Sequence, residues 1–189
     1  METEIKILKC LLGNKEPKTI RTIAKEIKAD YKIVHTASSI LLSNGLVEKI
    51  KIGSSFQISL VYKLSEKILI AEYQRREEAL KNKDLRTILD YFDRNLKSSL
   101  YIMLLFGSHV KQTQTKHSDI DLLFIVPKQE MENDINRVAS LIPLKIHINV
   151  FTEQDFKAMK NSREITVGSE AIKNNIILKG IEAYYGELR

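Results

Sequence analysis

Two short groups of residues, Gly107-Ser108 and the pair Asp119 and Asp121, have types and a spacing suited to phosphate and metal chemistry. Gly107 and Ser108 directly follow an apolar run that is typical of a strand. A glycine there lets the backbone approach a phosphate closely, and the start of a following helix offers free N–H groups. The Ser108 hydroxyl adds a further donor, so we expect a phosphate group to bind at this turn.

Asp119 follows Ser108 after ten intervening residues, and Asp119 and Asp121 stand at positions i and i+2 at the start of a second apolar strand. Because side chains alternate along a strand, both carboxylates are expected on the same face. Two carboxylates that close repel each other, and Mg²⁺ relieves the repulsion by binding oxygen ligands. Beside a bound triphosphate, this arrangement is typical of metal-assisted nucleotidyl transfer.

The stretch resembles the minimal nucleotidyltransferase family of the DNA polymerase beta superfamily, whose mark is Gly-Ser, ten residues and then Asp-x-Asp. The resemblance covers about residues 85–185. It implies an α/β nucleotidyltransferase fold with a mixed sheet, ATP or another nucleoside triphosphate as substrate, and Mg²⁺ held by catalytic Asp119 and Asp121. The positions on the family pattern are Gly107, Ser108, Ser118, Asp119, Ile120, Asp121 and Leu122, and Leu178-Lys179-Gly180 resembles the family's C-terminal part.

The chain departs from the family directly after Gly-Ser. There the family has a small residue, an Arg and a Gly, whereas this chain has Val110, Lys111 and Gln112. The positive charge is therefore kept and the glycine is not. The residues expected to bind the nucleotide are Gly107, Ser108, Lys111 and Ser118.

A second departure concerns the next strand, expected at residues 144–151, where the family places a third carboxylate. In this chain the apolar residues of the strand alternate with His147 and Asn149, and neither is a carboxylate. An Asn oxygen is a weaker Mg²⁺ ligand and does not act as a base, whereas His accepts a proton but is a poor ligand for a hard cation. We expect Asn149, in preference to His147, at the third-acid position and as a metal ligand.

Three functions are compatible with these residues. In the first, the domain is an enzyme that binds ATP with Mg²⁺ and transfers a nucleotidyl group to a hydroxyl acceptor. The family resemblance suggests that this acceptor is a tyrosine of a HEPN-family ribonuclease toxin, with this chain as the antitoxin. The missing third acid instead favours a DNA-binding transcription regulator whose transferase domain is catalytically degenerate. Modification of a small molecule, as in aminoglycoside nucleotidyltransferases, fits the motif but does not explain the N-terminal region.

The elements that must position the site are predicted from the spacing of apolar residues. Three strands carry or flank the motif, and the segment beyond Thr152 is expected to be helical, with a short apolar run at 176–178. Two further helices, at 64–83 and 84–97, are expected to connect this region to the N-terminal one. The strands are expected at 100–106, 120–126 and 144–151, with a helix near 129–142.

Residues 1–62 resemble the winged helix-turn-helix family in the order of their expected elements. Three short helices are followed by two β-branched, alternating segments joined by Gly53-Ser54-Ser55, a hairpin signal. Thr19 and Asp30 are suited to cap the second and third helices. The sequence thus predicts an α+β winged-helix domain over 1–62, connecting helices over 63–97 and an α/β nucleotidyltransferase domain over 98–189.

The third helix, over 31–44, would be the recognition helix of such a domain. We expect its apolar residues to face inward and its polar residues, Ser38 and Ser43 among them, to face outward. Protein–protein association is the alternative use of this face. The inward residues are Ile33, Val34, Ala37, Ile40 and Leu41. The expected DNA-binding residues are Lys32, His35, Thr36 and Ser39, with Lys49 and Lys51 on the wing.

The charge distribution supports a polyanionic partner for the N-terminal part. The net charge is +6, and residues 101–189 contain equal numbers of basic and acidic side chains, so the excess lies in the first hundred residues. We expect double-stranded DNA to be attracted there. No apolar run reaches the roughly 20 residues of a membrane span, and we expect a cytoplasmic protein without a membrane partner. The single cysteine, Cys10, excludes an internal disulfide, and a homodimer is a further candidate assembly.

Overall fold

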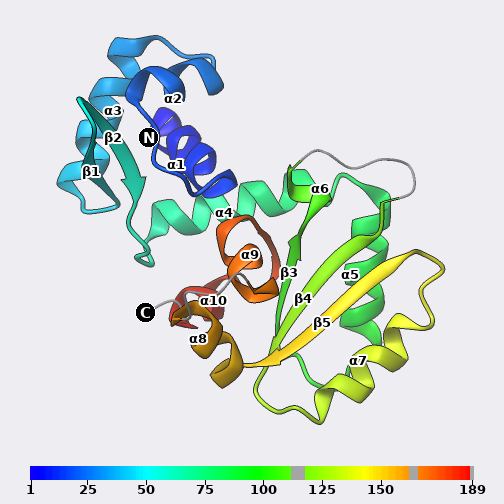
Figure 1. The fold of residues 1–189 in the computed structure, drawn as a ribbon. Coiled ribbons are helices and arrows are strands. Elements are labelled where there is room, and N and C mark those ends of the chain that lie inside the picture. The colour runs from blue at the N-terminus through cyan, green and yellow to red at the C-terminus, as the bar shows by residue number, and fades with distance from the viewer. Residues whose placement is uncertain (112–117, 162–165, 188–189) are drawn as a thin grey trace. The chain divides into compact units, whose positions relative to one another are not determined.

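The computed structural model describes residues 1–111, 118–161 and 166–187 and divides the chain into two compact units, residues 1–74 and 75–188 (Figure 1). The boundary falls inside helix α4 (Glu66–Ala79). Gln112, which replaces the family's glycine, lies outside the described residues. Among the described helices, none has both the length and the apolar character that crossing a bilayer requires.

The first unit consists of three helices and a hairpin, in the order that the sequence predicts. Two of the helix starts are fixed by predicted caps: the Thr19 hydroxyl accepts from the Thr22 N–H at 3.1 Å, and the Asp30 carboxylate accepts from the Lys32 N–H at 2.8 Å. The elements are α1 (Glu2–Gly13), α2 (Ile20–Glu26), α3 (Tyr31–Ser43), β1 (Val47–Ile52) and β2 (Ser55–Leu60).

The hairpin β1–β2 is antiparallel and turns at Gly53, whose φ of +60° suits a glycine. The sequence did not predict that β2 also pairs on its other side. The backbones of Lys18 and Ile58 exchange two hydrogen bonds, of 2.9 and 2.7 Å, in an isolated antiparallel bridge. The segment before α2 is therefore held to the hairpin.

The buried face of α3 differs from the predicted one. Ile33 and Ile40, expected inward, are 55% and 42% exposed, whereas Ser38, expected outward, is fully buried. The physical reason is which side of α3 its neighbours cover: the buried stripe follows positions i, i+3, i+4 and i+7, and the two isoleucines lie beside it. The buried stripe is Val34, Ala37, Ser38 and Leu41.

The second unit contains a four-stranded mixed sheet of order β5-β4-β3-β6, which agrees with the sheet that the resemblance implies. β3 pairs antiparallel with both β4 and β6, and β4 pairs parallel with β5. The edge strand β6 arises from the apolar run at 176–178, which the sequence placed in a mainly helical segment. The strands are β3 (Ile102–Phe106), β4 (Ile120–Val126), β5 (Ile146–Thr152) and β6 (Ile176–Lys179).

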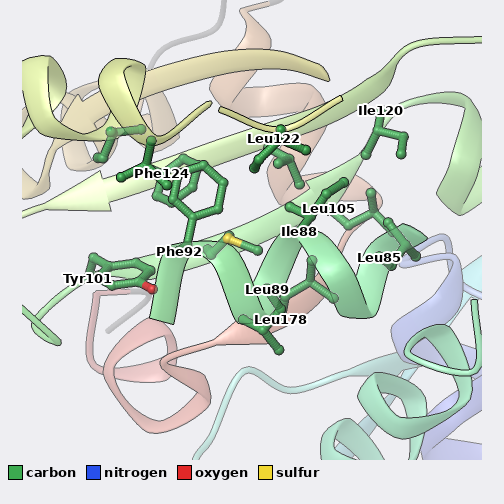
Figure 2. Packing of buried hydrophobic residues seen from close by; sticks show 14 of the residues in the cluster. Leu85, Ile88, Leu89, Phe92, Tyr101, Leu105, Ile120, Leu122, Phe124 and Leu178 are labelled. Carbon is green, nitrogen blue, oxygen red and sulfur yellow. The ribbon is translucent and has the colours of Figure 1, made fainter. Parts of the chain in front are cut away.

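One face of this sheet forms a hydrophobic core with α5 (Lys83–Asn95) and α7 (Met131–Ala139). Figure 2 shows the apolar face of α5 packed beneath the strands, with Phe92 against Phe124 at a ring distance of 4.8 Å. The sequence assigned α5 to the connecting segment. Its place in this core follows from the regular spacing of Leu85, Ile88 and Leu89, which buries one complete face of the helix.

The opposite face of the sheet is covered by α8 (Glu153–Asn161), α9 (Val167–Lys173) and α10 (Ile181–Glu187), as Figure 1 shows. Phe156 and Tyr184 are fully buried there, with their rings 6.2 Å apart. Because residues alternate between faces along a strand, Asp121 of β4 and the β5 residues His147 and Asn149 lie on this second face. The candidate site is therefore formed on the side of the sheet that carries α9.

Candidate active site

A pocket of about 400 Å³ lies on this second face, where β3 ends and the short helix α6 (Ser108–Lys111) begins. The strand β3 delivers the Gly-Ser turn, β4 and β5 contribute polar side chains, and α9 forms a further wall. We call it the Asp121 pocket. Its lining residues are Phe106, Gly107, Ser108, Lys111, Asp121, His147, Asn149, Val167 and Glu170.

Asp121 is placed in the pocket by the register of the sheet. It is the second residue of β4 and stands opposite Phe106, the last residue of β3. Its neighbours Ile120 and Leu122 are buried in the α5–α7 core, so strand alternation directs the carboxylate to the other face. The Asp121 side chain retains 26% exposure, which leaves it accessible from the pocket.

Gly107 makes this placement of Asp121 sterically possible. Its φ is +72°, a region that residues with a side chain rarely adopt. A Cβ atom built on Gly107 would lie 2.2 Å from Oδ2 of Asp121 and 3.0 Å from its Cγ. The glycine of the Gly-Ser motif therefore leaves room for the carboxylate of the Asp-x-Asp motif and also permits its own backbone conformation.

Asp119 and Ser118 are placed differently from Asp121. Asp119 is exposed and precedes β4, whose first residue, Ile120, donates its N–H to the Lys145 carbonyl at 2.9 Å. Neither Asp119 nor Ser118 is among the described residues that line the pocket. The two aspartates thus lie at the start of one strand, but only Asp121 forms part of the pocket wall.

β5 brings two polar residues, His147 and Asn149, to the pocket. In the parallel β4–β5 register, His147 stands beside Asp121 and Asn149 beside Leu123. His147 Nδ1 lies 3.4 Å from Asp121 Oδ1, and the His147 side chain is 64% exposed. His147 is therefore the direct neighbour of the acid, and Asn149 lies two residues further along the strand.

The Asn149 side chain has an unmet hydrogen-bonding group. Its Nδ2 is buried and has no hydrogen-bond partner among the described residues. Turning the amide by half a revolution exchanges nitrogen and oxygen within the same space, so Asn149 is able to present either atom to a ligand. A buried amide N–H without a partner is costly.

Lys111 is held by an acid that the sequence analysis did not single out. Its Nζ lies 2.6 Å from Oε1 of Glu170, and both side chains are close to half exposed. Lys111 stands at the last position of α6 and Glu170 in the first turn of α9. The cation expected to bind phosphate therefore already has an anionic partner in the pocket wall.

The donor set of the pocket fits a Mg²⁺ ion that is bound together with a nucleotide. Among the described residues, no group of three or more His, Cys, Asp or Glu side chains is gathered as a metal cage. Mg²⁺ commonly uses one or two carboxylates plus substrate phosphates rather than such a cage. Asp121 and the Asn149 oxygen are hard ligands of the kind it prefers, and Asp119 lies two residues from Asp121.

In the first unit, the structure places all the predicted DNA-binding residues on exposed surface. Lys32, His35, Thr36 and Ser39 are exposed on α3, and Lys49 and Lys51 are exposed on β1. Three of these side chains make contacts within the first unit. The Thr36 and Ser39 hydroxyls each donate to a carbonyl one turn earlier at 3.0 Å, and Lys49 Nζ lies 4.0 Å from the centre of the Phe56 ring.

An open hollow of about 600 Å³ between α2 and α3 adds three exposed cations that the sequence analysis missed, Arg21, Lys25 and Lys28. The available signal was the i, i+4 spacing of Arg21 and Lys25 on the outward side of α2. Lys28 follows α2 with a positive φ of 54°, which directs the chain into the turn before α3.

Comparison with known proteins addresses the second unit. The family model described as "Polymerase beta, Nucleotidyltransferase" matches residues 86–182, about half of the chain, and includes the whole Gly-Ser to Asp-x-Asp stretch. Searches of curated proteins and of solved structures find no match to the chain. The matched segment contains β3, β4, β5 and β6 and every residue of the Asp121 pocket. The chain therefore belongs to the polymerase beta nucleotidyltransferase family.

Proposed function

We propose that the second unit binds ATP with Mg²⁺ in the Asp121 pocket and transfers a nucleotidyl group to a hydroxyl acceptor. The observation that carries this proposal is the meeting of three features in one pocket of about 400 Å³: the Gly107 turn, the Lys111 cation and the Asp121 carboxylate. A triphosphate needs a close backbone approach, a cation and a metal-binding acid, and the pocket offers all three.

The expected roles follow from the chemistry of each side chain. Gly107 and Ser108 contact phosphate oxygens through backbone N–H groups and a hydroxyl, and Lys111 neutralises phosphate charge. Asp121, with Asp119 and an oxygen of Asn149, holds Mg²⁺, which when bound offsets the charge of the triphosphate. The acceptor oxygen forms a bond to the α-phosphorus as the bond to the departing pyrophosphate breaks, and the proton of the acceptor hydroxyl is released to solvent.

The acceptor that we propose is a tyrosine of a partner protein, a HEPN-family ribonuclease toxin, with this chain as its antitoxin. The support is the family of the second unit and its combination with a basic N-terminal unit, which suits regulation of a toxin–antitoxin pair. Incubation of the full chain with ATP labelled at the α-phosphate, Mg²⁺ and proteins from the same operon tests it. Label on the partner is expected, and label that moves only to small molecules would contradict it.

A second function is favoured by β5, where His147 and Asn149 stand in place of an acid. In this version the chain is a transcription regulator whose transferase domain binds nucleotide without turnover. The same labelling experiment separates the two. Mg²⁺-dependent ATP binding without transfer to any operon protein supports the regulator, whereas labelled product supports the enzyme.

We further propose that the first unit is a winged-helix domain that binds double-stranded DNA. Three helices followed by a hairpin are the elements of such a domain, and α3 would enter the major groove. The support is electrostatic: Lys32 and Lys51 are exposed, and Arg21, Lys25 and Lys28 surround the hollow before α3. Cations on several elements allow contacts to several phosphates at once.

A further inference from the structure

Glu170 is an acidic residue of the Asp121 pocket that comes from outside the Gly-Ser and Asp-x-Asp stretch. It lies 59 positions after Lys111 in the sequence and pairs with it at 2.6 Å. Among the described residues that line the pocket, the carboxylates are those of Asp121 and Glu170. The remaining polar side chains on the sheet, those of His147 and Asn149, supply no negative charge.

The position of Glu170 is set by a helix that is anchored on both sides of it. At the start of α9, the Thr166 hydroxyl accepts from the Ser169 N–H and the Ser169 hydroxyl accepts from the Thr166 N–H, which forms a reciprocal cap. Gly168 lies so close to Met159 that an added Cβ would be 2.7 Å from its sulfur, and Ala171 is fully buried. The inward positions therefore fix α9, and Glu170 lies on the side that faces the pocket.

The end of α9 is equally well held. Asn175, which is fully buried, donates to the Ala171 carbonyl at 2.6 Å and lies 2.7 Å from the Tyr184 hydroxyl. The guanidinium of Arg75 donates to the Asn175 carbonyl at 2.5 Å. Helix α9 is thus held at both ends, by the cap at its start and by the hydrogen bonds of Asn175 after its end. These contacts position Glu170 next to Lys111.

We propose that Glu170 supplies the carboxylate that β5 lacks, and that it acts as a third acidic residue of the nucleotide and metal site. This inference rests on the proposed binding of ATP and Mg²⁺. Without nucleotide, Glu170 holds Lys111. When a phosphate engages Lys111, the Glu170 carboxylate is released and joins Asp121 as an oxygen ligand for the divalent cation.

The charges in the pocket explain why this exchange depends on metal. A triphosphate and Glu170 are both anions and compete for the Lys111 ammonium, so Glu170 opposes nucleotide binding when no metal is present. A divalent cation is attracted by both carboxylates and by the phosphates, and it removes the repulsion between them. Glu170 should therefore have opposite effects on ATP affinity in the absence and in the presence of Mg²⁺.

The experiment compares ATP binding to the full-length wild type and Glu170→Gln by calorimetry, in EDTA and in MgCl₂. In EDTA, Glu170→Gln is expected to bind ATP about two- to fivefold more tightly, the scale of an exposed ion pair. In MgCl₂ it is expected to bind at least about tenfold more weakly, as when oxygen partners of a metal site are removed. Mn²⁺ affinity in the presence of ATP, followed by electron paramagnetic resonance, should fall in parallel.

Two further variants make the result specific. In a Lys111→Gln background, the effect of Glu170→Gln in EDTA should shrink to the direct repulsion between the carboxylate and the phosphates, because there is no cation to release, whereas its effect in MgCl₂ should be kept. Glu153→Gln, which removes an exposed acid of α8 that does not line the pocket, should change neither affinity. Melting temperatures of all variants establish that they are folded.

The outcomes separate this inference from the proposed function. If Asp121→Asn abolishes Mg²⁺-ATP binding while Glu170→Gln binds as the wild type does under both conditions, the role of Glu170 is refuted and the proposed function stands. If Glu170→Gln weakens binding equally with and without Mg²⁺, Glu170 only positions Lys111, and the inference also fails. If the wild type does not bind Mg²⁺-ATP, both are wrong.

Discussion

The Asp121 carboxylate occupies the space that a Cβ atom on Gly107 would need, since the two would lie 2.2 Å apart. The two residues belong to different halves of the motif, one at the end of β3 and one in β4. Their contact explains in steric terms why the motif pairs a glycine with an aspartate at this separation. It also provides a sharp mutational test of the site.

Gly107→Ala should destabilise the protein and impair Mg²⁺-ATP binding. The new methyl group both clashes with Asp121 and forces a side chain into a positive φ, a combination expected to cost about 1–3 kcal/mol. Chemical denaturation measures the loss. Gly186→Ala is the matched control because nothing lies within 4 Å of its added Cβ. That helical substitution should be neutral or slightly stabilising, and equal losses in both variants would disprove the steric account.

Asp121→Asn should lower the affinity for Mg²⁺-ATP by at least about tenfold while the fold is retained, because it removes a charged metal ligand that borders the pocket. Asp119→Asn should act in the same direction. Isothermal titration with MgCl₂ and ATP measures both. Asp90→Asn, on the exposed side of α5, is the control for charge alone. A wild-type affinity in Asp121→Asn would exclude it as a ligand.

Asn149→Asp should strengthen metal binding in the presence of ATP, since it places a charged oxygen in the pocket where an amide nitrogen is now buried without a partner. In the Glu170→Gln background it should restore part of the lost Mg²⁺ dependence. Titration of Mn²⁺ checks both expectations. If His147→Asp has these effects and Asn149→Asp does not, the third-acid position is the one directly beside Asp121.

Replacing Lys32, Lys49 and Lys51 together with Ala should weaken binding to double-stranded DNA and lower its salt dependence. Each phosphate contact removed should reduce the slope of log affinity against log salt by about one unit. Fluorescence anisotropy over a range of KCl concentrations measures the slope, and the triple Lys→Arg variant should keep it. An unchanged slope in the alanine variant would place the DNA-binding surface elsewhere.

The alanine substitution of Arg21, Lys25 and Lys28 tests the hollow before α3 separately. It should reduce the slope by a similar amount, about one unit per lost contact, if these cations also reach phosphates. The comparison of the two triple variants shows which elements contribute to the surface. A fully retained affinity in this second variant would restrict the surface to α3 and the hairpin.

The stability of the first unit should depend on pH through Glu4, whose pKa is held below its ordinary value of 4.5 by a hydrogen bond from Lys67. The depressed pKa means that this contribution is complete above pH 4.5 and is lost as the pH falls through the folded-state pKa. Glu4→Gln should therefore reduce the free energy of unfolding at pH 7 by about 1–2 kcal/mol, and this effect should shrink as the pH falls below 4.5.

Unfolding of both proteins in urea across this pH range measures the difference. Glu2→Gln is the control, because the Glu2 side chain is 83% exposed and its pair with Lys6 is largely screened. The account is wrong if the difference between wild type and Glu4→Gln stays constant from pH 7 to pH 3.

Local patterns in the sequence predicted those parts of the fold that depend on neighbouring residues. The caps at Thr19 and Asp30 and the strand from Ile120 to Val126 are found as expected. These features depend on side chains within a few positions of one another. The Gly107 turn and Asp121 were also recognised together, because their separation in the chain is fixed by the family's motif.

Features that depend on packing between distant segments were not predicted. The exposure of Ile33 and Ile40 depends on where neighbouring elements cover α3, and hydrophobicity alone does not reveal it. The pairing of β6 with β3 requires segments some seventy residues apart in the sequence. Glu170 gave no local signal, since an acid in the first turn of a helix is common and its partner Lys111 lies 59 positions away.

The position of the unit boundary inside α4 determines how the chain can be dissected. Ile68 and Ala71, near the start of the helix, are buried, and Arg75 and Arg76 donate to the carbonyls of Asn175 and Leu178 in the second unit. Cutting the chain between Ala71 and Arg75 would remove main-chain hydrogen bonds from the middle of helix α4. Recombinant fragments of the two halves should therefore overlap, each including all of Glu66–Ala79, and a protease should find no preferred cleavage point there.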